Sequence, residues 1–102
     1  MREIIAEICR EQQSLGMEAV IKSCHQVLQN QYPGLRLNWS RIYGKRWSYV
    51  YGEGEPLSPN RQRVELGPRW GLYIDNPEIV PVGELDSIIQ ALKAGWPDES
   101  GK

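Results

Sequence analysis

The spacing of apolar side chains changes twice along this chain, and each change limits the secondary structure that a segment can form. Over residues 2–30, apolar residues recur every three or four positions, which places them on one side of an α-helix. Over residues 35–75, apolar and polar residues alternate as they do in strands with one buried face. Residues 85–92 return to helical spacing. The sequence therefore predicts an α+β domain.

The N-terminal segment is predicted to be helical until Pro33-Gly34 ends it. Ser14-Leu15-Gly16 interrupts the pattern, because glycine costs roughly 1 kcal/mol relative to alanine inside a helix and Ser14 is a suitable cap for a second helix. Two structures are compatible with this pattern: a continuous or kinked helix, and a two-helix hairpin split near residues 14–16. The unbroken apolar stripe favours the single helix. Its members are Ile4, Ile5, Ile8, Leu15, Ala19, Val20, Val27 and Leu28.

Four strands are predicted between the helical segments, separated by Gly- and Pro-containing turns and by a longer loop over residues 52–60. Short connections favour antiparallel neighbours, because a parallel crossover needs about a dozen residues or more. We therefore predict a four-stranded antiparallel β-meander, covered on one face by the N-terminal helix and by a C-terminal helix that Gly95 and Pro97 end. The predicted strands are 35–40, 46–51, 61–66 and 70–74.

The aromatic residues are all Trp or Tyr, four and five of them, and eight lie between Tyr32 and Tyr73 among interleaved arginines. Such side chains combine a large apolar ring with a polar atom and are enriched at interfaces. Strand alternation predicts that the arginines point to the open face of the sheet. It predicts that the rings of Trp39, Trp47, Tyr49, Tyr51 and Trp70 point toward the helices.

The length and charge of the chain limit its organisation and its partners. At 102 residues it is predicted to form a single domain over residues 1–97, followed by a disordered tail at 98–102. The net charge of −1 argues against a general nucleic-acid coater, although residues 35–75 carry seven basic and four acidic groups. No signal peptide or membrane-spanning run is visible, so a cytoplasmic protein with free thiols is expected.

The residue types that often carry catalysis are not arranged for it here. Cys24 and His25 are helical neighbours that point about 100° apart, so we expect a packed thiol and an imidazole near the surface. On a straight helix Cys9 and Cys24 lie about 22 Å apart, and only the hairpin alternative brings them together. Glu53 and Glu55 are typical of a solvated turn. No metal ligand set, cofactor motif or catalytic residue is predicted.

The predicted function is non-catalytic binding through an Arg-rich sheet face rimmed by Tyr and Trp, which contacts a protein partner or a second copy of the chain. Simple core filling by the aromatic residues explains the composition equally well and is compatible with that function. The candidate partner-binding residues are Arg36, Arg41, Tyr43, Lys45, Arg46, Arg61, Arg63 and Tyr73.

Two alternatives remain open. Single-stranded nucleic acid is bound by stacking bases on exposed aromatic rings beside Arg and Lys, but the predicted phase separates the rings from the arginines. A small-molecule pocket between sheet and helices is the second alternative. The residues predicted to line such a pocket are Trp39, Trp47, Tyr49 and Trp70.

Overall fold

The computed structural model describes residues 2–53 and 59–97. Within those ranges it contains helices at both ends of the chain and a four-stranded antiparallel sheet, which confirms the predicted α+β class. The predicted tail at 98–102 and residues 54–58 of the predicted loop, including Glu55, lie outside the described residues. The elements are α1 (Arg2–Gln12), a 3-10 helix (Gln13–Leu15), α2 (Met17–Gln31), β1 (Leu37–Tyr43), β2 (Arg46–Gly52), β3 (Gln62–Glu65), β4 (Trp70–Ile74), a 3-10 helix (Pro77–Ile79) and α3 (Val82–Gly95).

The N-terminal segment forms two helices, so the favoured prediction of a single helix is wrong and the hairpin alternative is confirmed. Gly16 has φ 105° and ψ 164°, a backbone conformation that L side chains rarely adopt and that a helix cannot contain. The chain reverses there, and α1 packs against α2. Both helices therefore contribute to one apolar layer. Their buried residues are Ile5 and Cys9 on α1, and Val20, Ile21, Cys24, His25 and Leu28 on α2.

The sheet has the strand order β2-β1-β4-β3, in which every neighbouring pair is antiparallel. The predicted meander would place the strands in sequence order, and this detail of the prediction is wrong. Two hairpins, β1–β2 and β3–β4, meet through β1 and β4 at the centre of the sheet. The connection from β2 to β3 therefore crosses from one edge of the sheet to the other, a step for which the loop over residues 52–60 is long enough.

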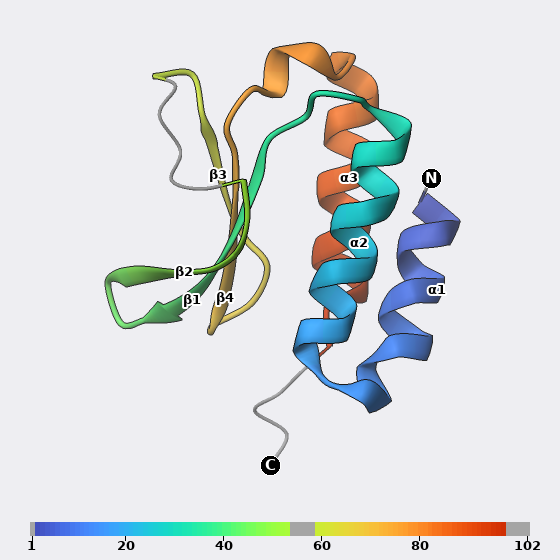
Figure 1. Cartoon of the computed structure of the whole chain (residues 1–102), viewed down its shortest axis with the longest axis vertical. Helices are drawn as coiled ribbons and strands as arrows, with labels where there is room; N and C mark the ends of the chain where they lie inside the picture. The colour runs from blue at the N-terminus through green and yellow to red at the C-terminus, as the bar shows by residue number, and fades with distance from the viewer. Residues whose placement is uncertain (1, 54–58, 98–102) are drawn as a thin grey trace.

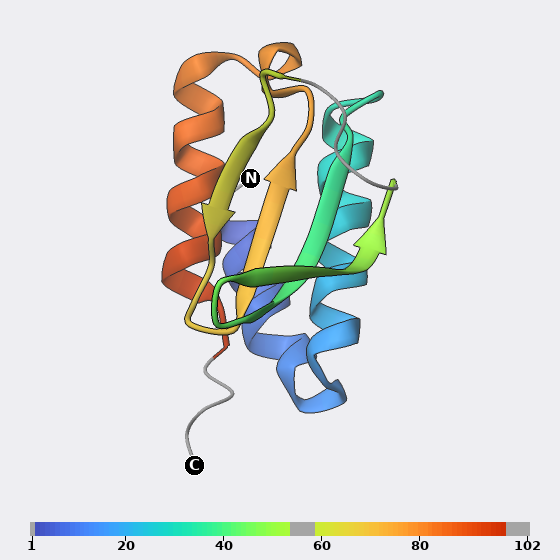
Figure 2. The ribbon, with the colours of Figure 1, turned by 90° about the vertical axis from the view of Figure 1, so that its left-hand side faces the viewer.

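The helices all lie on one side of the sheet, and the other face is open. In Figure 1, α2 and α3 stand between the sheet and α1. Figure 2, viewed from the open side, shows α1 behind the space between α2 and α3, and α1 contacts both of these helices. The same view shows the first half of β2 crossing in front of β1 and β4. This strongly twisted hairpin places β2 side chains over the open face.

The core lies between the sheet and the helices. Trp39 is completely buried there, as predicted, and its ring stacks on Trp96 after α3 with a centroid distance of 5.7 Å. Trp70 is also buried on this side. The helix-facing side of the sheet is therefore part of the buried apolar core that stabilises the fold.

The α1–α2 hairpin brings the thiols of Cys9 and Cys24 into contact, which the straight-helix alternative excludes. Both cysteines are free and buried. The hydrogen bond with Cys9, and then burial, raise the pKa of Cys24. Because the thiolate is the nucleophilic form, this protonated thiol is a packing group.

Candidate binding surface

The turn between β1 and β2 determines which β2 side chains reach the open face. The strands are joined by the two residues Gly44-Lys45, and this register pairs Trp47 with Ile42. Ile42 is three residues beyond Trp39, which faces the helices, so it lies on the opposite side of the sheet. Trp47 therefore lies on the open face. The prediction that Trp47 and Tyr49 point toward the helices is wrong, because it treated the two strands as independent although a tight turn couples their phases.

A β-bulge then changes the phase inside β2. Val50 has no partner on β1, because Trp39 pairs with Tyr51 while Ser40 pairs with Tyr49. One extra residue turns the side chains that follow it to the other face. Tyr49 consequently lies on the open face, where half of its side chain is exposed. Tyr51 points toward the helices, as predicted.

Four side chains gather on the open face, and we call them the open-face cluster: Trp47, Tyr73, Arg61 and Arg63. The Trp47 and Tyr73 rings are 5.1 Å apart at 51°. The Arg63 guanidinium lies 5.1 Å from the Trp47 ring, and that of Arg61 lies 6.0 Å from the Tyr73 ring. The indole crosses Gly71, where a Cβ would lie only 2.2 Å from it. The cluster is therefore built from β2, β3 and β4 and depends on a glycine at its centre.

Arg63 is available for a further partner. Within residues 2–53 and 59–97 no carboxylate lies within ion-pairing distance of its guanidinium. A cation–π contact with an indole does not use the N–H donors of the guanidinium for hydrogen bonds. Glu65 follows on the same face of β3, opposite Gly71. The cationic end of this surface is thus at the β3 residues 61–63.

Asn38 is the one asparagine on β1, and it lies beside the cluster with an unbonded side chain. It pairs with Tyr73 on one side and with Gly52 on the other, which places it on the open face. Only 1% of the residue is exposed, and neither Nδ2 nor Oδ1 has a hydrogen-bond partner among the residues that the structure describes. An unsatisfied buried amide costs about 1–3 kcal/mol, so this residue is not explained by stability.

Three of the predicted partner-binding residues lie at the tip of the β1–β2 hairpin. Tyr43 and Arg46 are paired and exposed, and the guanidinium lies 5.4 Å from the phenol ring. Lys45 is exposed in the turn between them. This tip is separate from the open-face cluster because its register places Tyr43 and Arg46 on the helix-facing side of the strands.

The other two predicted contact residues are engaged within the fold. Arg41 lies 4.9 Å from the Trp70 ring, on the helix-facing side. Arg36 Nε donates to the buried Asp75 carboxylate at 3.2 Å, and a further guanidinium nitrogen donates to the carbonyl oxygen of Glu53. Arg36 thus ties the start of β1 to the ends of β2 and β4.

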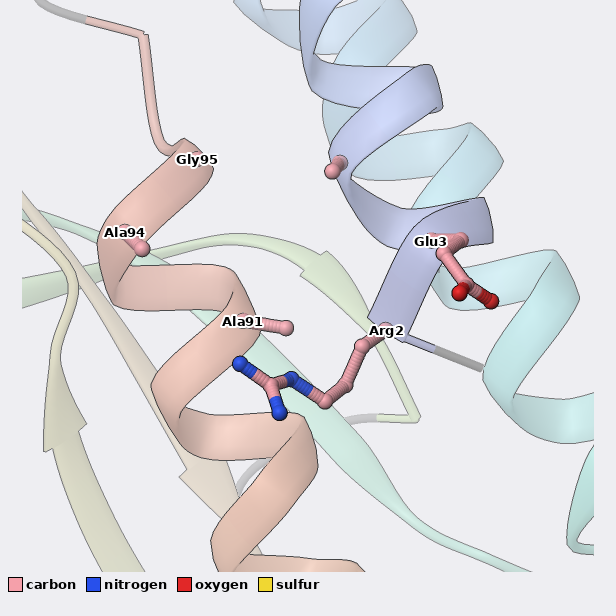
Figure 3. A pocket seen from close by; sticks show the side chains of 6 residues that line it. Arg2, Glu3, Ala91, Ala94 and Gly95 are labelled. Atoms are coloured by element: carbon pink, nitrogen blue, oxygen red, sulfur yellow. The ribbon is translucent and has the colours of Figure 1, made fainter.

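The residues predicted to line a small-molecule pocket are divided between the two faces of the sheet. Trp39 and Trp70 are buried against the helices, whereas Trp47 and Tyr49 lie across the sheet. A hollow with a volume of about 440 Å³ lies between α1 and α3 (Figure 3), lined by four small residues and by two charged ones. Arg2 extends from α1 toward α3 at this hollow. Its lining residues are Arg2, Glu3, Ala6, Ala91, Ala94 and Gly95.

His25 is buried, with 5% of the residue exposed, so the prediction of a surface imidazole is wrong. Nδ1 accepts a hydrogen bond from the Trp39 indole at 3.0 Å, which requires Nε2 to carry the proton and donate to Glu53 at 2.9 Å. Gln29 donates to the same carboxylate oxygen. Glu53 is exposed in a bend after β2, as the sequence predicted, and its carboxylate also bonds to His25 and Gln29. Both imidazole nitrogens are occupied, so His25 has no nitrogen left for proton transfer to a substrate.

Two further features are absent from the described residues. Within them, no group of three or more His, Cys, Asp or Glu side chains is placed to hold a metal ion. Among the helices of residues 2–53 and 59–97, none combines the length and apolar character that crossing a bilayer requires.

Comparison of the chain with protein-family models, with curated proteins and with solved structures finds no significant match. The fold places the molecule in the broad class of α+β domains with one open sheet face. Function is therefore argued from the side chains on that face.

Proposed function

We propose that this protein is a non-catalytic binding domain that contacts a protein partner, or a second copy of itself, through the open face of its sheet. The observation that carries the proposal is the position of Trp47, whose large apolar ring lies outside the core on a face rich in arginine. Trp, Tyr and Arg are the residue types that dominate protein interfaces energetically. The proposal places the protein in the cytoplasm, where its two thiols stay reduced.

The geometry favours a protein partner over a stack of bases. A stacking platform needs ring faces that are open to the ligand. Here Arg63 lies over Trp47 and Arg61 lies over Tyr73. A partner that bonds to the guanidinium edges and packs against the ring edges leaves these contacts intact, whereas a base has to displace them.

The test is a comparison of immobilised wild-type protein with the variant Trp47→Ser, using quantitative mass spectrometry of proteins retained from a lysate. We expect at least one protein to be retained by the wild type and lost from the variant, or the wild type alone to form a dimer in analytical ultracentrifugation. Arg10→Glu is the control, because Arg10 is exposed on α1, far from the sheet. Identical retention and identical mass for all three proteins would overturn the proposal.

Single-stranded nucleic acid is the second candidate, and one observation favours it. The open face carries three aromatic rings beside two arginines, whereas the sequence predicted rings and arginines on opposite faces. The rings are those of Trp47, Tyr49 and Tyr73. If this candidate is correct, oligothymidylate added at low salt quenches Trp fluorescence, and added salt reverses the effect. Fluorescence that does not change at 20 mM salt would exclude it.

A further inference from the structure

We propose that the outer edge of β3 binds an extended segment of a protein partner, which adds to the four-stranded sheet as one more antiparallel strand. The segment carries a basic, an apolar and an acidic residue in succession. Over residues 2–53 and 59–97, β3 is the last strand on its side of the sheet. The inference goes beyond the proposed function, because it concerns the edge of the sheet and not its open face.

The backbone of β3 directs hydrogen-bonding groups away from the sheet. The Leu66 N–H donates to the carbonyl oxygen of Trp70 at 2.9 Å, and the bonding groups of an antiparallel ladder alternate along the strand from there. Val64 consequently bonds to β4, whereas the N–H and C=O groups of Arg63 and Glu65 point outward. An edge of this kind is a template for one more strand.

A groove follows this edge between β3 and α3. Figure 2 shows α3 beside β3 at the outer side of the sheet. Two hollows with volumes of about 340 and 420 Å³ lie between these elements, one at each end of β3. A paired strand places every second side chain on the helix side, so its apolar residues would cover the first hollow, where Val82 is 85% exposed. The lining of that hollow is Gln62, Val82, Gly83, Leu85, Asp86 and Ile89.

The charged side chains of the edge determine which segment fits. Arg63 and Glu65 are exposed on the open side of β3, since the intervening Val64 is buried on the helix side. In an antiparallel neighbour, an acidic residue opposite Arg63 and a basic residue opposite Glu65 each form an opposite-charge pair. The residue between them lies opposite Val64 and faces the groove. The preferred order from N- to C-terminus is therefore basic, apolar, acidic.

The occupant is a segment without a helix beside it, and not a second copy paired through its own β3. Paired strands lie about 4.8 Å apart, whereas packed helices need about 8–10 Å between their axes. Because α3 lies at the outer side of β3, the α3 helices of two copies would collide before the strands reached pairing distance. A single extended segment avoids this conflict.

The experiment is an NMR titration of the whole chain with the blocked peptide Thr-Lys-Val-Glu-Val-Thr and with Thr-Glu-Val-Lys-Val-Thr, in which the two charges are exchanged. We expect the first peptide to shift the backbone amide signals of Arg63 and Glu65 and to slow their hydrogen exchange. The amide of Val64 already bonds to β4 and should move less. The exchange turns two opposite-charge pairs into like-charge pairs, so the second peptide should bind about tenfold more weakly.

Two variants separate the contribution of the backbone from that of the charges. Glu65→Pro removes an outward N–H and leaves the ladder with β4 intact, so it should stay folded by circular dichroism and bind the first peptide about tenfold more weakly. The double variant Arg63→Glu/Glu65→Arg should reverse the preference between the peptides. Glu7→Arg/Arg10→Glu is its matched control, because both residues are exposed on α1. This control should keep the wild-type preference.

The outcomes separate this inference from the proposed function. The edge site is wrong if neither amide signal moves, if both peptides bind equally, or if the double variant keeps the wild-type preference. A dimer in analytical ultracentrifugation that Glu65→Pro makes monomeric would assign the edge to a second copy and overturn the inference. A lysate protein that Glu65→Pro retains and Trp47→Ser loses would support the open face without the edge.

Discussion

The two faces of the sheet use the same aromatic residue types for different purposes. On the helix-facing side, Trp39 is fully buried, stacked on Trp96, and bonded through its indole to His25. On the open side, Trp47 is only partly buried and lies under the Arg63 guanidinium. Buried indoles usually have a hydrogen-bond partner inside the protein, as Trp39 does, whereas an exposed one can leave its polar atom to solvent or to a ligand. Residue type alone therefore does not distinguish a core from a contact surface.

The two faces should differ most in how far the free energy of unfolding falls when their tryptophans are truncated. We expect Trp39→Ala to lower the free energy of unfolding by about 3–5 kcal/mol, because it leaves a cavity and an unbonded His25 nitrogen. Trp47→Ala should cost about 1–2 kcal/mol, since the ring is partly exposed. Urea unfolding followed by circular dichroism measures both values. Equal losses would break the distinction between a stabilising face and a binding face.

The packing of Trp47 on the open face can be tested at Gly71. A Cβ there would meet the indole at 2.2 Å, so we expect Gly71→Ala to cost about 1–3 kcal/mol by overpacking. The cost should largely disappear when Trp47 is also replaced by alanine, which a double-mutant cycle of unfolding free energies measures. Additive losses would mean that the indole does not lie over Gly71 in solution.

Replacing Asn38 should raise the free energy of unfolding, whereas replacing a core residue lowers it. We expect Asn38→Leu to raise the free energy of unfolding by about 1 kcal/mol, because it removes a buried amide that has no partner within residues 2–53 and 59–97. Thermal unfolding by calorimetry measures the gain. A destabilised Asn38→Leu variant would show that the amide is satisfied in the free protein.

The smallest effects on stability should come from exposed members of the open face. Tyr49→Ser and Arg63→Lys are each expected to change the free energy of unfolding by less than about 0.5 kcal/mol, since surface substitutions rarely do more. Their effect should appear in partner binding instead. Urea midpoints that fall as far as that of Trp47→Ala would place these side chains among the stabilising residues.

The candidate site was only partly predictable, and the reason lies in strand phase. Alternation correctly places Arg63 and Tyr73 on the open face, because β3 and β4 are short and regular. It fails for β2, where the two-residue turn sets the starting phase and the bulge at Val50 changes it again. The turn length was readable at Gly44-Lys45 and predicts Trp47 outward once Trp39 is inward. The bulge leaves no clear mark in the sequence.

The buried polar residues show a second limit. His25 and Glu53 are far apart in sequence, and their hydrogen bond exists because α2 packs beside the end of β2. Asn38 reads as an ordinary polar residue of an alternating strand, and nothing in its neighbours indicates that its amide is buried without a partner. Burial is a property of the assembled layers, so a single strand does not reveal it.

By itself the sequence determined the α+β class, the four strands and the C-terminal helix, because helical and strand periods of apolar residues are local properties of the chain. Tertiary structure decided the strand order, the split of the N-terminal helices and the face on which Trp47 lies. These depend on long-range pairing and on single-residue shifts of register, and one residue is enough to move a side chain from the core to the surface. The binding face proposed here exists because of such a shift.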